Sequence, residues 1–166
     1  MTHAFLRDLA LTAKLDKSID SLMGVCSLKD IHIIAERLPH LRIILDHFGN
    51  VRLDGKPLAQ EWVADFRAEA KHPNVHCKVS TLYGRFVQQP APRNLDAYRE
   101  ILDLSYESFG ENRLGFGSDW PVSESTADYA NLLALTKSYF SSKDASVAAK
   151  VFHRNAVKFY ALPEKE

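Results

Sequence analysis

The chain lacks the features that would assign it to a membrane, to nucleic acid or to a secreted class of protein. No apolar run approaches the ~20 residues of a membrane helix, and the N-terminus has no apolar core of a secretion signal. With 21 basic and 21 acidic residues, the formal net charge is zero, so there is no electrostatic case for binding nucleic acid or an acidic membrane. We therefore expect a cytoplasmic protein.

Cysteine is also scarce, and no low-complexity segment interrupts the chain. Cys26 and Cys77 show no C-x-x-C spacing and are too few to staple a fold. We interpret them as buried thiols rather than as a disulfide or a zinc knuckle. The absence of a linker predicts one domain over residues 1–166.

What is present is an alternation of strand-like and helix-like segments. Expected strands lie near residues 19–25, 41–47, 74–80 and 114–119, and expected helices near 5–13, 28–38, 62–70, 94–110, 126–140 and 144–160. Strand and helix alternating with short turns is typical of parallel βαβ construction, so the predicted fold class is α/β. A long loop with Gly and Pro, residues 83–92, is of the kind that shapes substrate pockets.

The most informative stretch is Gly115 to Pro121. Strand alternation sends Gly115, Gly117 and Asp119 to one face, which leaves Asp119 at the carboxyl end of a face cleared of side chains. An α/β barrel keeps its chemistry at this end of its strands. The alternative is that Asp119 only caps the turn before Pro121.

A second stretch ends in ionisable residues after an apolar run. His47 shares the face of Ile43 and Leu45, so a strand here would point the imidazole the same way as these buried residues. Asp46 would then point away from a pocket, toward a helix or loop. A histidine after a strand can also be a purely structural residue.

The third stretch, residues 74–80, has one apolar and one polar face. Val75, Cys77 and Val79 alternate with His76, Lys78 and Ser80. A polar face can be a solvated surface, but a parallel barrel covers both faces of its sheet, and there the polar face would form the mouth of a site.

Together these residues resemble the TIM-barrel amidohydrolase-2 family, which groups sugar-acid lactonases, a pyrone-dicarboxylate lactonase and metal-dependent decarboxylases. The resemblance runs over nearly the whole chain, most closely over residues 38–162, and is nearest to the lactonase-like branch. It implies an incomplete (β/α)8 TIM-type barrel with C-terminal strands and helices. It is carried by Asp46-His47, Asn74-Val75, residues 77–80, residues 109–114, residues 117–122, Val151-Phe152 and Asn155-Ala156.

The resemblance implies roles for four residues. His47 is similar to the fifth-strand histidine, a metal ligand in metal-using members, and Asp119 to the last-strand aspartate that handles the proton of the attacking water. Both His47 and Asp119 are thereby candidate ligands of the metal. A divalent metal, zinc first, would lower the pKa of bound water to about 7, and a carboxylate beside it would act as general base. Lys78 is similar to the sixth-strand lysine that binds a substrate oxygen, and Trp120 would wall the pocket.

Structural roles compete with some of these assignments. Lys78 could instead bridge a carboxylate inside the barrel, because a buried ammonium needs a partner in any case. His76, on the face of Lys78, and His153, in the last helix, are interpreted as structural or surface residues.

The chain departs from the family in length. A TIM barrel takes typically about 250 residues, whereas this chain has 166, and its motifs belong to the second half of the barrel. We expect the first three strands to be missing, with the His-x-His ligands of the first, which His3 does not replace. The remaining sheet would have open edges and an uncovered apolar face.

The resulting hypothesis is a hydrolase in which water, activated by Asp119, attacks the carbonyl of a lactone or related cyclic ester. Its partners would be a small-molecule substrate of the lactone or sugar-acid type, and either a second copy of the chain or the missing N-terminal half of the barrel. The alternative is a truncated, non-catalytic relative that acts only as a folding or interaction module.

Overall fold

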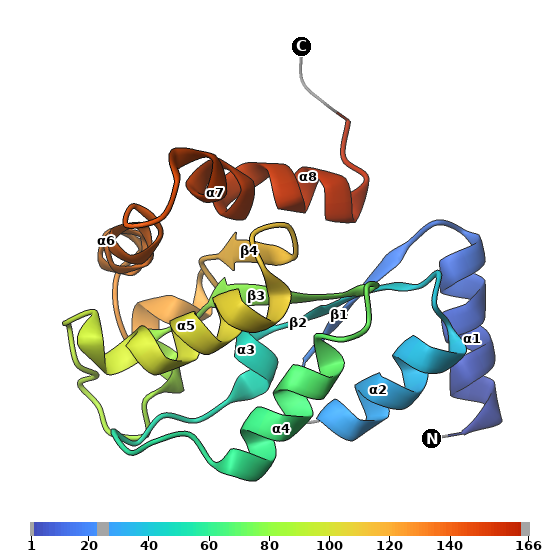
Figure 1. Ribbon diagram of the computed structural model, residues 1–166, viewed down its shortest axis with the longest axis horizontal. Coiled ribbons are helices and arrows are strands. Elements are labelled where there is room, and N and C mark those ends of the chain that lie inside the picture. The colour runs from blue at the N-terminus through green and yellow to red at the C-terminus, as the bar shows by residue number, and fades with distance from the viewer. Residues whose placement is uncertain (1, 23–26, 164–166) are drawn as a thin grey trace.

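A four-stranded parallel sheet runs through the centre of the structure, a computed structural model that describes residues 2–22 and 27–163 (Figure 1). Its order is β1-β2-β3-β4, and the strands are β1 (Ser18–Ser21), β2 (Arg42–Leu45), β3 (Val75–Ser80) and β4 (Leu114–Gly117). Each strand follows the preceding one along the chain with a helical connection between them. The predicted α/β class with parallel strands is therefore confirmed.

Helices flank the sheet on both sides. In Figure 1, α2 and α4 lie below the sheet and α7 and α8 above it. No helix in the described part of the chain is long and apolar enough to cross a membrane. The helices are α1 (His3–Lys14), α2 (Leu28–Arg37), α3 (His47–Asn50), α4 (Gln60–Glu69), α5 (Asp96–Phe109), α6 (Tyr129–Phe140), α7 (Ala145–Ala149) and α8 (Asn155–Tyr160), with 3-10 turns η1 (Tyr83–Arg85) and η2 (Val122–Ser125) and a π-helical turn η3 (Lys150–Arg154).

One face of the sheet forms the apolar core. The register sets Leu45, Cys77 and Leu114 side by side across three strands, and each is at most 1% exposed. They pack in one hydrophobic cluster with the apolar faces of the helices. The buried thiol predicted for Cys77 is confirmed, while Cys26 lies outside the described residues.

The opposite face is largely polar. By register, Asp20, Ile44 and His76 share this face, and Lys78 and Gly115 lie beside them. The expectation of an uncovered apolar face is wrong for the described residues, because Ile44 is buried, the other positions are polar or small, and Phe159 of α8 packs against His76.

The order of the strands corrects their numbering in the barrel. β3 pairs directly with β4, and residues 81–113 contribute no strand between them beyond an isolated bridge of Phe86 with Leu53. Lys78 therefore cannot stand on the sixth strand if Asp119 follows the eighth. If Asp119 follows the last strand, Lys78 belongs to the seventh and His47 to the sixth.

The C-terminal segment contacts the outer edge of β4 at the first residue of that strand. It was expected as one helix over 144–160, but the π-helical turn η3 interrupts it, which brings Asn155 to the sheet. The Asn155 side-chain amide donates to the backbone carbonyls of Glu111 and Leu114, both at 2.8 Å. Since Arg113 O accepts from β3, the neighbouring Leu114 carbonyl points to the open edge, where only Asn155 satisfies it among the described residues.

We expect Asn155→Ala to lower the free energy of unfolding by about 1–3 kcal/mol, because it leaves two carbonyls without their donor in a buried setting. Urea unfolding followed by circular dichroism measures the change. The matched control is Asn131→Ala, which removes only a bond to exposed Asp128 and should change stability by no more than about 0.5 kcal/mol. Equal losses in the two variants would contradict the role given to Asn155.

Candidate functional site

The site begins where β2 ends. After Leu45, His47, Phe48 and Gly49 take left-handed backbone conformations, with φ of 51°, 58° and 64°. This turn removes His47 from the alternation of the strand and brings its Nδ1 to 2.7 Å from Ser80 Oγ, at the end of β3. The prediction that His47 shares the face of Ile43 and Leu45 is wrong, because the strand has ended before it.

Asp46 takes the direction that was not expected of it. Its Oδ1 lies 2.7 Å from the Nζ of Lys78, on the polar face of the sheet. Strand alternation places Asp46 on the same face as Ile44 and not on the face of Leu45. Its side chain therefore points toward the candidate site and not away from it.

Asp119 approaches His47 across the end of β3, because Asp119 follows β4, His47 follows β2 and β3 lies between these two strands. Its Oδ1 lies 3.6 Å from His47 Nε2, and its Oδ2 accepts a hydrogen bond from Thr81 Oγ1. Thr81 and Asp119 follow the ends of β3 and β4 and also have left-handed backbones, with φ of 55° and 59°. Such conformations cost non-glycine residues of order 1–3 kcal/mol each and cluster at functional sites, so their gathering here marks a candidate site.

Glycine allows this close approach. A Cβ at Gly117 would lie 3.2 Å from the Cβ of Ser80, tighter than most side-chain contacts. The face of β4 next to Ser80 is thus cleared, and the two strand ends can bring Asp119 and His47 together.

Lys78 lies at the centre of a charged cluster on the polar face. Its ammonium is 2.5 Å from Asp20 Oδ2 and 2.7 Å from Asp46 Oδ1, and Tyr160 of α8 donates to Asp20 at 2.9 Å. Burial alone would lower the pKa of Lys78, but its hydrogen bonds to Asp20 and Asp46 outweigh burial and raise it. Lys78 is therefore a fixed positive charge at neutral pH.

His47 is uncharged at neutral pH. Burial, assisted by the positive charges of Arg85 and Lys78, lowers the pKa of its imidazole and prevails over Asp119 and Asp46, which raise it. The side chains of His47 and Asp119 are 13% and 20% exposed, so the pair is sheltered but reachable by water. A neutral imidazole beside a carboxylate can orient a water molecule whose proton the carboxylate takes.

Some of these residues could be found from sequence and others could not. Thr81 directly follows Ser80 at the end of a strand, so the rule that polar residues at strand ends mark a site could have identified it. Asp20 and Tyr160 are bonded across nearly the whole chain and left no local signal. Trp120 is 65% exposed, and its indole donates to Glu124 at 2.8 Å, so its place in a pocket wall stays a prediction.

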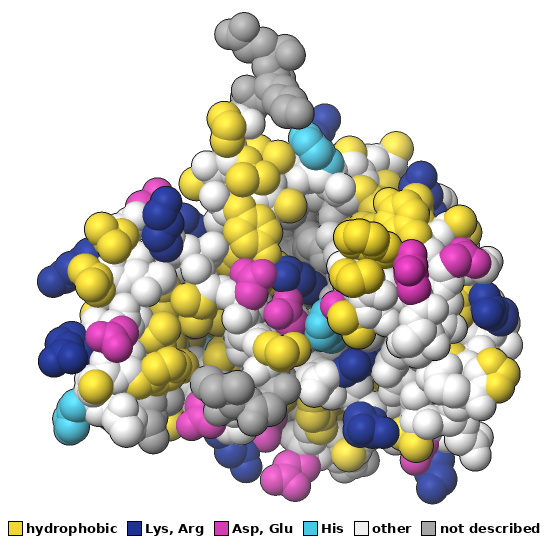
Figure 2. Space-filling view, turned by 180° about the vertical axis from the view of Figure 1, so that it is seen from behind, with side chains coloured by type: hydrophobic (Ala, Val, Ile, Leu, Met, Phe, Trp, Pro, Cys, Tyr) yellow, Lys and Arg dark blue, Asp and Glu magenta, His cyan; other side chains and the backbone are white. Residues whose placement is uncertain are grey.

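The charged residues face the open side of the sheet. Figure 2 shows acidic, basic and histidine side chains meeting in the middle of the molecule, seen from behind. A separate groove of about 850 Å³ beside α3 is lined by Gly49, Leu58 and Trp62 among others, and includes none of His47, Lys78 and Asp119. We place the candidate site by its chemistry rather than by that groove.

A resident zinc ion does not fit this pair of residues alone. Catalytic zinc normally takes three protein ligands and a water. Within residues 2–22 and 27–163, no third His, Cys, Asp or Glu donor groups with those of His47 and Asp119. The positive charges of Lys78 and Arg85 are also felt at His47, and they would repel a further cation bound there.

His76 has a structural setting on the same face. Its ring packs against Phe159 of α8 with centroids 4.8 Å apart. Burial, assisted by the charges of Arg113, Lys158 and Arg42, lowers the pKa of His76 to about 4. The neutral ring is thus part of the packing between α8 and the sheet.

Comparison with known proteins gives this geometry a context. A family model described as amidohydrolase matches residues 13–162. An L-fucono-1,5-lactonase of Burkholderia ambifaria is 34% identical over 154 residues, which cover 89% of this chain and 51% of the relative. An L-fucono-1,5-lactonase of Burkholderia multivorans is 32% identical over 168 residues, with 96% and 56% covered.

A solved structure agrees with the fold. The crystal structure of an amidohydrolase from Burkholderia multivorans with bound zinc superposes with a TM-score of 0.87 at 29% identity, covering 98% of this chain and 58% of that one. The chain thus spans about half the length of the curated relatives it matches, and its sheet corresponds to part of their barrel.

We expect His47→Asn to leave the zinc content of the 166-residue chain unchanged, because two donors do not hold zinc tightly. Elemental analysis after dialysis of the wild type and the variant measures this. Zinc that is bound near stoichiometry by the wild type and lost in His47→Asn would show that this pair has further ligands.

Titration of His76 should make the chain less stable in acid. Its folded-state pKa of about 4 lies below the ordinary value of 6.5, so the unfolded chain takes up the proton first as the pH falls. The contribution of neutral His76 to the free energy of unfolding is full above pH 6.5. It is lost as the pH falls toward 4, by up to about 3 kcal/mol. Urea unfolding at several pH values should show a weaker acid loss in His76→Phe than in wild type. Exposed His153→Phe is the control, and equal pH profiles for His76→Phe and wild type would refute the assignment.

Proposed function

The chain belongs to the amidohydrolase family, and from this premise we propose that His47 and Asp119 form part of the active site of a lactone hydrolase. The observation that carries the proposal is the approach of the Asp119 carboxylate to within 3.6 Å of the His47 imidazole, at the carboxyl ends of two strands, β4 and β2, that flank β3. The curated relatives at 34% and 32% identity are L-fucono-1,5-lactonases, which supports a lactone or sugar-acid derivative as the substrate.

In the proposed reaction, Asp119 is the general base. It takes a proton from a water molecule whose oxygen forms a bond to the lactone carbonyl carbon. The tetrahedral intermediate then collapses, the bond from this carbon to the ring oxygen breaks, and the protonated Asp119 returns its proton to that oxygen. Water and lactone thus become the open hydroxy acid with no other reactant.

Neighbouring residues would hold this base and its water in place. Thr81 donates to one oxygen of Asp119 and leaves the other, Oδ1, facing His47. Ser80 occupies Nδ1 of His47, so Nε2 is directed at the same space. Correct placement of reacting groups is a large part of catalysis, and both supports come from the end of β3.

Lys78 would act as a fixed charge in the same site. The ammonium holds Asp46, next to His47, and we propose that it also presents its charge to a substrate oxygen. Its bonds to Asp20 and Asp46 equally support the purely bridging role. Trp120 is proposed as a movable wall of the pocket, since it is exposed in this structure.

The second candidate is a non-catalytic folding or interaction module. It is favoured by one observation, the coverage of only about half of the curated relatives. Catalysis needs groups held in fixed geometry, and this chain corresponds to only 51% and 56% of the two lactonases.

The test is made on a completed barrel, in which this chain follows the N-terminal portion of the Burkholderia ambifaria lactonase. Asp119→Asn keeps the shape of the side chain but removes the base, so we expect kcat for lactone hydrolysis to fall by about 10²–10⁴-fold. His47→Asn should also lower kcat. The 166-residue chain alone should show little or no turnover.

The control is Asp8→Asn, at an exposed position of α1, which should leave the rate unchanged. Circular dichroism of each variant separates loss of catalysis from loss of fold. Full activity of the completed Asp119→Asn protein, or robust lactonase activity of the isolated chain, would refute the mechanism.

A further inference from the structure

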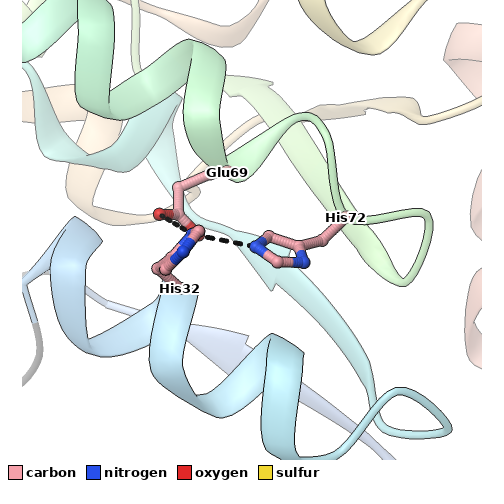
Figure 3. A group of neighbouring side chains, drawn as sticks. All are labelled: His32, Glu69 and His72. Atoms are coloured by element: carbon pink, nitrogen blue, oxygen red, sulfur yellow. Dashed lines mark hydrogen bonds and ion pairs between the residues drawn. The ribbon is translucent and has the colours of Figure 1, made fainter.

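A second group of potential metal ligands lies at the opposite end of the sheet from His47 and Asp119. His32 projects from the middle of α2, Glu69 is the last residue of α4, and His72 lies in the turn that leads to β3 (Figure 3). The three side chains point toward one another from these segments. One ligand atom from each lies within 4.8 Å of the other two.

We propose that His32, Glu69 and His72 form a binding site for a divalent cation of the zinc class that joins α2 to the turn between α4 and β3. His32 Nδ1 lies 2.8 Å from His72 Nε2 and 3.7 Å from Glu69 Oε1. Zinc bonds of about 2.0–2.2 Å in tetrahedral geometry place ligand atoms about 3.3–3.5 Å apart. The two observed separations lie on either side of this value, so small side-chain rotations suffice.

Glu69 gives an independent reason to expect a cation. Its side chain is only 2% exposed, and its Oε2 has no hydrogen-bond partner among the described residues. A buried carboxyl group with an unpartnered oxygen is costly, and a cation bound by this carboxyl group would offset that cost.

The surroundings of His32 suit a ligand. Glu36, one helical turn further along α2, has Oε1 at 3.5 Å from the Nε2 of His32. A carboxylate at one ring nitrogen orients a ligating histidine and fixes the other nitrogen as the one that binds the metal. The Nδ1 of His32 is also the nitrogen that lies next to His72 Nε2, so both imidazoles direct a ring nitrogen to the same place.

The site is also open to solvent. His32 is 41% exposed and His72 is partly exposed, while Glu69 forms the buried floor. An ion can therefore enter from solution, and water can complete the coordination beside three protein ligands. This composition, two imidazoles and one carboxylate, is one that zinc takes with an open position.

The experiment is a zinc titration of the 166-residue chain, in competition with a chromophoric chelator. We expect one equivalent to bind to the wild type, to His47→Asn and to exposed His40→Gln. His72→Gln and Glu69→Gln should each weaken binding by more than tenfold. Glu36→Gln should weaken it by about 10–100-fold, as expected for a group that only orients a ligand.

Two further measurements keep the outcome decisive if a variant folds poorly. Zinc should raise the thermal midpoint of the wild type but not that of His72→Gln. X-ray absorption of the zinc-loaded wild type should show two imidazoles with oxygen ligands. No zinc binding by the wild type, or zinc retained in His72→Gln and lost in His47→Asn, would overturn the proposal. The latter result would place the metal at the proposed active site.

Discussion

The ammonium of Lys78 is the interaction on which the arrangement of the sheet and site depends. From β3 it reaches Asp20 on β1 and Asp46 beyond the end of β2, so one side chain links three strands across the polar face. Tyr160 donates a hydrogen bond to Asp20, which links α8 to the same cluster. Charges removed from water must be paired, so the cluster fixes these segments relative to one another and leaves His47 beside Asp119.

Much of the scaffold followed from local patterns. Alternation over residues 74–80 assigned the faces of β3, and helical periodicity found the segments that cover its apolar side, because burial imposes period 2 on strands and 3.6 on helices. The pattern failed where the period was broken. His47 left its expected face because β2 stops at Leu45 and the four residues 47–50 are left-handed. The helix expected over 144–160 contains a π-helical turn that its hydrophobic pattern did not reveal.

The residues of the candidate site are spread widely along the sequence, and this spread limited their prediction more than their chemistry did. Asp119 and His47 stood out because each follows an apolar run, a signal contained in a few neighbouring residues. Asp20, Tyr160, His32 and His72 meet their partners only through the tertiary fold, and a single sequence carries no record of such distant contacts. The polar residues close to strand ends were therefore identified, and those that complete the clusters were not.

The amide of Asn155 has a consequence for how the chain behaves among copies of itself. A parallel sheet ends in strands whose free carbonyl and amide groups can recruit a strand from another molecule. At β4 the side chain of Asn155 already occupies the outward carbonyl of Leu114, and η3 and α8 follow beside it. A strand from a second copy would have to displace this amide before it could pair with the first residue of β4, so Asn155 makes the start of that edge less open to such pairing.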